Sequence, residues 1–348
     1  MPRATIRFGV TTQRQNASQH FARNLQYEFE DAFCELTGAR LINIPPAPKL
    51  GLGQRALRKA GFPQTIVVPE IEEGLDVLFV PSILTYWLGL EHIRNWREKC
   101  GKVVYYLFDA WPTEITGSHL RRHFQNECDA VYVSFKESVE FLQRQLKPPV
   151  RYLPQAADQR RFRFRAGSRL IFCAALARQD ESFLAKTKAY CHERDLLLMY
   201  STEHGTFRRG WEDAQDMYAE TFRHAKYSLH WSAKTRSNWA SMLTADPPTA
   251  RWFQAAAAGS LLVGTPPDSP EWEALFPAGS ITDVRDFHND PAEVFRYLES
   301  QPQDRLQAKA KALSDHVLAH HTWQHRVRRI LEDFGLQEVL NRTSGRKE

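Results

Sequence analysis

The stretch that decides the fold is a short predicted helix followed directly by a predicted strand. It reads Asp246-Pro247-Pro248-Thr249-Ala250-Arg251-Trp252-Phe253-Gln254-Ala255-Ala256-Ala257-Ala258-Gly259-Ser260-Leu261-Leu262-Val263-Gly264. The prolines and Thr249 indicate a helix start, with Thr249 able to cap it, and the alanine-rich turns indicate close packing. Gly259 indicates the helix end, and the apolar run after it predicts a buried strand.

The same alternation of strand and helix extends over the rest of the chain. Short β-rich runs are separated by helix-length segments, which is typical of βαβ units. Runs such as 103–108 are apolar on both faces, as expected of parallel strands covered by helices on each side. We therefore predict an α/β protein with two Rossmann-like domains facing a cleft. The runs lie at 5–10, 39–44, 77–81, 103–108, 129–134 and 150–154, and then at 169–174, 195–200, 227–231, 261–264 and 280–282.

The length of 348 residues fits two domains. A stretch at 154–168, which starts with Pro154 and continues with charged residues alternating with aromatics, looks like the linker between them. We predict a first domain at 1–156, a second at 157–320, a closing helix at 321–340 that crosses back to the first domain, and a tail at 341–348.

Composition excludes several classes of protein. Lys plus Arg is 46 and Asp plus Glu is 41, a net charge of +5, which argues against a generic nucleic-acid coat. The apolar stretches fall short of the ~20 residues that a bilayer span needs. Residues 1–8 show no apolar signal region, and the five cysteines are odd in number and widely spaced. We therefore expect reduced thiols, no transmembrane segment and a cytoplasmic location.

Arg251 is the first candidate for ligand binding. The free amides at a helix N-terminus attract phosphate, and Arg251 adds a fixed positive charge with bidentate donors at this helix start. Gln254 lies three residues further and shares a helix face with it.

A family resemblance follows from this stretch. Residues 227 to about 332 resemble the C-terminal half of GT-B glycosyltransferases, in the branch called spore-maturation-type or glycosyl transferases group 1. That branch has Arg-x-Phe-Glu-Ala-x-Ala-x-Gly before a buried strand, and 251–259 follow the pattern except that Gln254 replaces Glu. Residues 321–326 resemble the family's last helix start, and 152–158 with Phe162 resemble its interdomain entry.

The resemblance implies roles for particular residues. The family Glu that holds the donor ribose is Gln254 here, and Asp246, eight positions earlier, matches the first acidic residue of the family's E-x7-E pair. Gln keeps one acceptor and gains a donor, so it can still hold ribose. Asp109 follows a strand, where the family places an acceptor-side base, although it can equally cap its own turn.

Three further residues are candidates for contact with the nucleotide-sugar. Arg178 lies in a loop where GT-B enzymes often set a cation against the donor diphosphate, although a solvated surface Arg explains it nearly as well. His230 and Lys234, at and after the end of a predicted strand, are weaker candidates. Three histidine pairs have i, i+4 spacing, but no carboxylate completes a metal motif, so we expect no metal and no cofactor.

The resemblance implies a glycosyltransferase that moves a sugar from a nucleotide-sugar donor to a saccharide, small-molecule or protein acceptor, retaining and metal-independent. The alternative is a non-catalytic nucleotide- or glycan-binding protein on the same fold. The stripe of cations and aromatics at 160–165 could stack on single-stranded nucleic acid, but a linker strand explains it as well, and we expect no nucleic-acid partner.

Overall fold

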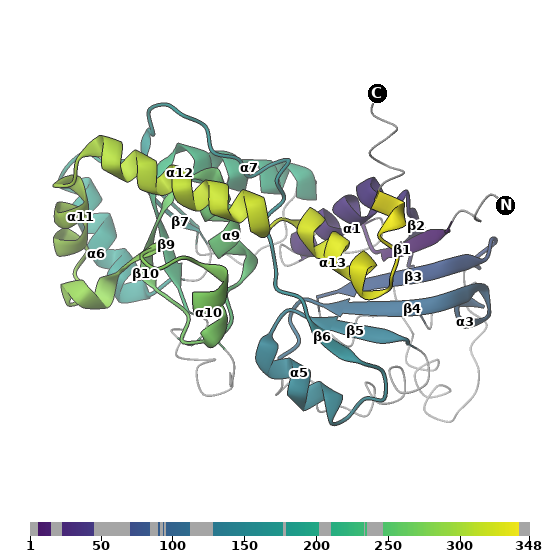
Figure 1. Cartoon of the computed structure of the whole chain (residues 1–348). Helices are drawn as coiled ribbons and strands as arrows, with labels where there is room; N and C mark the ends of the chain where they lie inside the picture. The colour runs from purple at the N-terminus through teal and green to yellow at the C-terminus, as the bar shows by residue number, and fades with distance from the viewer. Residues whose placement is uncertain are drawn as a thin grey trace, which may run out of the picture.

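The computed structural model divides into two α/β halves (Figure 1). It describes all residues except 1–5, 15–22, 45–69, 84–89, 91–92, 94, 112–127, 177–178, 202–209, 233, 235–245 and 341–348.

The first half is built on a parallel sheet that, in the described part of the chain, has six strands in the order β2-β1-β3-β4-β5-β6. All of its neighbouring strands pair in parallel. β1 lies next to the edge strand β2, and the chain crosses from β2 to the other side of β1 to form β3, so the order reverses between β1 and β3. The strands are β1 (Phe8–Thr12), β2 (Arg40–Asn43), β3 (Leu75–Ser82), β4 (Cys100–Leu107), β5 (Ala130–Val133) and β6 (Val150–Tyr152).

The second half repeats this design, with five described strands in the order β11-β10-β9-β7-β8, again all parallel. Here the order reverses between β7 and β9. Ligands of open α/β sheets bind outside the carboxyl ends of the strands at such a switch point. The strands are β7 (Ile171–Leu176), β8 (Leu198–Ser201), β9 (Ala225–Trp231), β10 (Leu261–Thr265) and β11 (Ile281–Asp283).

Helices cover both sheets on each face. In the first half they are α1 (Asn24–Thr37), α3 (Trp96–Lys99) and α5 (Lys136–Gln143). In the second half they are α6 (Glu181–His192), α7 (Trp211–His224), α9 (Ala250–Ala258), α10 (Pro270–Leu275), the 3₁₀ turn η5 (Val284–Phe287), α11 (Pro291–Glu299) and α12 (Gln303–His320). The α/β fold with two Rossmann-like sheets is therefore confirmed, and each predicted strand overlaps an observed one.

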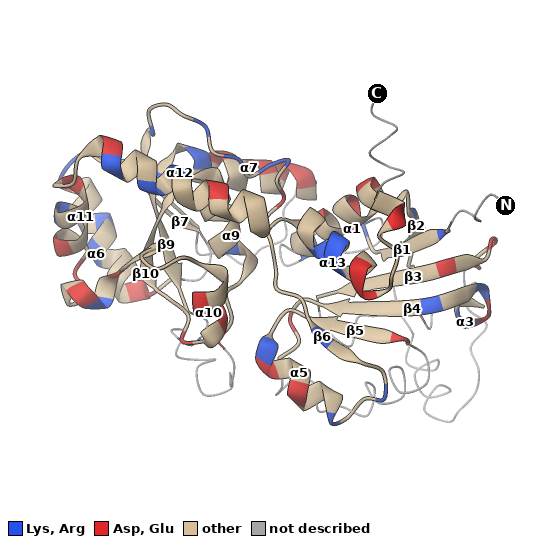
Figure 2. Ribbon diagram, in the orientation of Figure 1, with Lys and Arg blue, Asp and Glu red and all other residues tan. Residues whose placement is uncertain are grey.

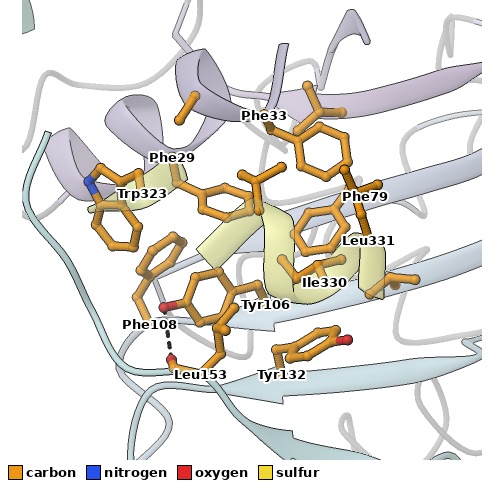
Figure 3. Packing of buried hydrophobic residues seen from close by; sticks show 14 of the residues in the cluster. Phe29, Phe33, Phe79, Tyr106, Phe108, Tyr132, Leu153, Trp323, Ile330 and Leu331 are labelled. Atoms are coloured by element: carbon orange, nitrogen blue, oxygen red, sulfur yellow. Dashed lines mark hydrogen bonds between the residues drawn. The ribbon is translucent and has the colours of Figure 1, made fainter. Parts of the chain in front are cut away.

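The helix α13 (Trp323–Asp333) returns to the first half, as predicted (Figure 1). Its apolar face packs against α1 and the first sheet. Trp323 stands edge-on to Phe29 of α1 and to Phe108, with ring centroids 5.9 and 5.7 Å apart (Figure 3). Ile330 and Leu331 are buried in the same cluster. The chain thus crosses twice between the two halves, while the exact boundary at residue 156 stays a prediction.

The helix predicted between Thr249 and Gly259 forms as α9, with one difference at its N-terminal end. Gly259 ends it at a φ of +82°, as expected. Thr249 occupies the N-cap position, but its side chain makes no capping hydrogen bond. The prediction that the Thr249 side chain caps the helix is wrong, because the amide of Trp252, which a capping hydroxyl could serve, donates to the backbone carbonyl of Thr249 at 3.1 Å.

Charged side chains of both signs lie mainly on the helices. Figure 2 shows both signs of charge on α6, α11 and α12, while the strands of both sheets are mostly uncharged. No helix among the described residues is both long and apolar enough to span a bilayer. All five cysteines are free thiols.

Candidate active site

The N-terminal end of α9 lies where three strands of the second sheet end. The guanidinium of Arg251 donates a hydrogen bond of 3.0 Å to the carbonyl of Leu176, the last residue of β7. Asp246, just before α9, accepts hydrogen bonds from Ser232, which follows β9, and from Asp268, which follows β10. Because β7 and β9 flank the switch point, this junction is where the fold favours a ligand.

Asp246 is a buried carboxylate with an evident structural task. Its Oδ2 accepts from the Ser232 hydroxyl at 2.5 Å and from the Asp268 backbone amide at 2.9 Å. Its side chain holds the ends of β9 and β10 together in front of α9. A role beside the donor sugar stays a prediction.

Arg251 brings a positive charge to the first turn of α9. A cation there opposes the helix dipole, which is positive at the N-terminal end, and an anion bound at this place would relieve the repulsion. The charge also acts on its surroundings, because it helps to lower the pKa of the buried His230. The structure thus brings Arg251 and Asp246 to one junction, while their contact with a donor stays a prediction.

Gln254 lies one turn further along α9 and is only 4% exposed. Its side-chain amide nitrogen is buried and has no hydrogen-bond partner among the described residues. A buried donor without an acceptor costs about 1–3 kcal/mol. An oxygen atom supplied by a ligand would remove that cost.

His230 lies inside the second half, between two aromatic rings. Its ring centroid is 4.8 Å from Trp252 and 6.0 Å from Phe222, and its Nε2 lies 3.0 Å from the Ser228 hydroxyl. Burial, with the charge of Arg251, lowers its pKa to about 3, so the ring is neutral at pH 7. The structure therefore gives His230 a packing role, and its contact with a nucleotide stays a prediction.

The remaining predicted residues lie around this junction or outside the described part. Lys234 is half-buried, and its backbone amide donates to the Ser232 hydroxyl at 3.1 Å. Asp109 follows β4 in the first half, where its own amide donates to the carbonyl of Ile83 and its carbonyl accepts from Trp111. Arg178 lies outside the described residues.

Gln155 is a residue that the sequence analysis passed over. Its side chain is buried and joins the two halves: Oε1 accepts from the backbone amide of Ala250 at 2.7 Å, and Nε2 donates to the carbonyl of Phe108 at 2.9 Å. It thus satisfies the first amide of α9, which a side chain at the N-cap position does not reach. Gln155 fills a variable position of the family's interdomain pattern, so its residue type gave no signal.

Glu271 of α10 makes the second such connection. Its carboxylate accepts a hydrogen bond from the backbone amide of Lys136, the first residue of α5. Burial raises the pKa of this carboxyl, while the Lys136 amide and charge lower it. Pro270 and Glu271 open a short helix, and nothing in that pattern indicates a partner in the other half.

Two other predicted features, a histidine metal site and the cationic stripe, can be compared with the structure. In the described part of the chain, no three His, Cys, Asp or Glu side chains are placed to hold a metal ion. Arg160 and Arg161 of the cationic stripe pair with Asp158 at 2.9 and 3.7 Å. These ion pairs favour the interpretation of 160–165 as a linker, although the segment forms a turn followed by irregular backbone and not a strand.

Comparison with known proteins agrees with this architecture. Residues 178–332 match a family model described as "Glycosyl transferase-like". A comparison with curated proteins gave no match.

Solved structures support the fold. An "alpha-glucosyltransferase in complex with UDP and a 13-mer DNA containing a central A:G mismatch" is similar with a TM-score of 0.58 and 10% identity, over 95% of this chain and 100% of that one. A structure described as "OtsA apo structure" has a TM-score of 0.51 and 11% identity, over 94% and 98% of the two chains.

A chain of the "GtfA/B complex" has 15% identity and a TM-score of 0.44, over 77% of this protein, which spans 58% of that chain. The predicted resemblance to GT-B glycosyltransferases is confirmed: this chain has the GT-B fold, and its residues 178–332 match the glycosyl transferase-like family.

Proposed function

We propose that this protein transfers a sugar from a nucleotide-sugar donor to an acceptor, with retained configuration and without a metal ion. Residues 157–320 hold the donor, and residues 1–156 hold the acceptor. The observation that carries the proposal is the buried amide of Gln254, which has no hydrogen-bond partner among the described residues and lies on the helix whose first turn carries Arg251 at the switch point.

The donor would lie along α9. Its ribose oxygens accept from the Gln254 amide, and its diphosphate meets Arg251, Arg178 and Lys234 near the helix start. As the bond between the sugar and the diphosphate breaks, negative charge grows on the leaving group. Preorganised positive groups stabilise that charge more than the ground state, and this difference accelerates the transfer.

The acceptor side is assigned to Asp109. It lies at the carboxyl end of β4, in the turn that Gln155 joins to α9. Its carboxylate orients the acceptor hydroxyl, while Asp246 fixes the strand ends beside the sugar. The acceptor is a saccharide, a small molecule or a protein. The free cysteines support a cytoplasmic location.

Uridine diphosphate is the first probe, because an alpha-glucosyltransferase of similar fold was solved with UDP. Calorimetry in EDTA is expected to detect UDP or another nucleoside diphosphate, and UDP-, GDP-, TDP- and ADP-sugars should raise thermal stability by mass action. Binding that required Mn²⁺ or Mg²⁺ would contradict the metal-independent mechanism.

A second measurement separates the enzyme from the binding protein. Wild type, Asp246→Asn and Gln254→Glu are compared for nucleoside diphosphate release from each sugar donor. An active enzyme predicts release from wild type and slower release from Asp246→Asn, in which the amide oxygen can still accept from Ser232 and Asp268. If wild type binds a donor but releases nothing and Gln254→Glu releases diphosphate, the alternative of a non-catalytic binding protein is correct.

A further inference from the structure

The two segments that cross between the halves lie side by side. The amide of Ala157 donates to the carbonyl of His321 at 3.1 Å, and the amide of Trp323 donates to the carbonyl of Ala157 at 3.2 Å. Residues 157 and 322 thus form a parallel β-bridge. The crossing is a paired backbone structure and not a single loose linker.

The backbone on each side of Gln155 is fixed from α13 and from β4. Arg326, which is buried, donates to the carbonyl of Pro154 at 2.8 Å and to that of Gln155 at 3.2 Å. The hydroxyl of Tyr106 donates to the carbonyl of Leu153 at 3.0 Å (Figure 3). These bonds leave the direction of the Gln155 side chain little freedom.

Gln155 is 1% exposed, and the two ends of its side-chain amide form hydrogen bonds with opposite halves of the protein. Its oxygen accepts from Ala250, the first residue of α9, and its nitrogen donates to Phe108, the residue before Asp109. An amide is suited to this position because the two targets, a backbone N–H and a backbone carbonyl, need one acceptor and one donor.

We propose that Gln155 is a positioning residue, which holds the first turn of α9 in register with the turn that carries Asp109. The inference rests on the proposed function, in which α9 binds the donor and Asp109 faces the acceptor. Transfer needs the two substrates within near-attack distance, and a misplacement of about 1 Å can lower the rate about 100-fold. Gln155 touches neither substrate and acts through the two turns.

Two variants separate its two hydrogen bonds. Gln155→Met keeps the length of the side chain and removes both bonds. Gln155→Glu keeps the acceptor for Ala250, but above its pKa it turns a carboxylate oxygen toward the carbonyl of Phe108. Gln159→Met is the control, because Gln159 lies on the same segment and its side chain makes no hydrogen bond among the described residues.

The expected result is a split between kcat and KM. In Gln155→Met, kcat falls at least about 10-fold while KM for the donor changes less than about 3-fold, because the proposed donor contacts, Arg251 and Gln254, keep their side chains on α9. In Gln155→Glu the loss is large at pH 8 and shrinks toward pH 5, where the protonated acid can again donate to Phe108. A folded Gln155→Met with unchanged kcat, or a Gln155→Glu loss that does not depend on pH, overturns the proposal.

A readout without catalysis distinguishes this failure from failure of the proposed function. Hydrogen exchange of the Ala250 amide is expected to speed up at least about 10-fold in Gln155→Met and to stay unchanged in Gln159→Met. If wild type shows no transfer with any donor, the proposed function fails, while the exchange result still decides whether Gln155 ties α9 to the first half. If the exchange rate of the Ala250 amide is unchanged in Gln155→Met, the proposal that Gln155 holds α9 against the first half is wrong.

Discussion

The carboxylate of Glu271, in the second half of the protein, accepts a hydrogen bond from the backbone amide of Lys136, which begins α5 in the first half. Gln155, on the crossing segment after β6, accepts a hydrogen bond from the first amide of α9 in the second half. Two helices at the junction are therefore capped by side chains from outside their own sequence neighbourhood. Association of the halves therefore satisfies the first amide of each helix, and these hydrogen bonds in turn stabilise the association.

We predict that Glu271→Ala lowers the stability by about 0.5–2 kcal/mol, the usual cost of a lost helix cap. Glu271→Gln keeps an acceptor for the Lys136 amide and should cost less. Glu273→Ala, on the exposed side of the same helix, is the control. Urea unfolding measures all three, and equal losses in Glu271→Ala and Glu273→Ala would contradict the cap.

A second prediction concerns Glu28 of α1, which is fully buried. Its carboxylate accepts from the indole nitrogen of Trp323 at 3.0 Å. Burial, followed by the nearby charge of Asp158, raises its pKa to about 8. The folded state therefore holds a proton that the unfolded chain loses above its ordinary pKa of 4.5. Stability from this group is fully present below pH 4.5 and is lost as the pH rises toward 8.

Glu28→Gln removes this titration and keeps an acceptor for Trp323. Its stability relative to wild type should increase between pH 5 and pH 9, by on the order of 3 kcal/mol. Urea unfolding over this range is the measurement, with Glu35→Gln, an exposed carboxyl of the same helix, as control. A difference from wild type that stays constant with pH would show that Glu28 is ionised in the folded state.

The strands and α9 could be predicted because their signal is local. Runs apolar on both faces, such as Val103 to Phe108, specify a parallel strand wherever the chain places them, and Gly259 specifies a helix end by its own backbone freedom. The sequence motif also predicts that Asp246, Arg251 and Gln254 lie in one region, because all three lie on or just before a single helix.

The cap of α9 could not be predicted, because it depends on a tertiary contact. Thr249 has the right residue type, but the Trp252 amide bonds its backbone carbonyl, and the first amide of α9 is satisfied by Gln155 from 95 residues away. For the same reason the position of His230 at a strand end did not reveal that its ring packs between Trp252 and Phe222, and its contact with a nucleotide stays a prediction. Sequence spacing places a residue on an element and leaves open what packs above it.

The third prediction tests the donor site. Arg251→Ala should weaken binding of UDP, or of whichever nucleoside diphosphate binds wild type, by about 1.5–3 kcal/mol, the range for hydrogen bonds to charged groups. Calorimetry in EDTA measures it, and circular dichroism checks that loss of the bond to Leu176 leaves the fold intact. Arg285→Ala, which removes an exposed Arg paired with Asp283, is the control. If a folded Arg251→Ala variant bound the nucleoside diphosphate as tightly as wild type, the role of Arg251 would be purely structural.

The last prediction concerns Gly264, where β10 runs against β9 beside the candidate site. A Cβ at this position would lie 1.8 Å from the backbone carbonyl oxygen of His230, its partner in the strand register. Its φ of +146° is also one that side-chain-bearing residues rarely adopt. Because the obstacle is backbone and not a flexible side chain, Gly264→Ala can be accommodated only by separating the two strands.

We expect Gly264→Ala to destabilise the protein by about 3 kcal/mol or more, at the upper end of overpacking costs, since hydrogen bonds are lost as well. Gly279→Ala is the matched control: its φ is +76°, but a Cβ there has nothing within 4 Å, so only the backbone strain of about 1–2 kcal/mol remains. Thermal and urea unfolding compare them. If both variants lost the same stability, the close approach of Gly264 to His230 would not be what holds β9 and β10 together at the ends that carry Ser232 and Asp268.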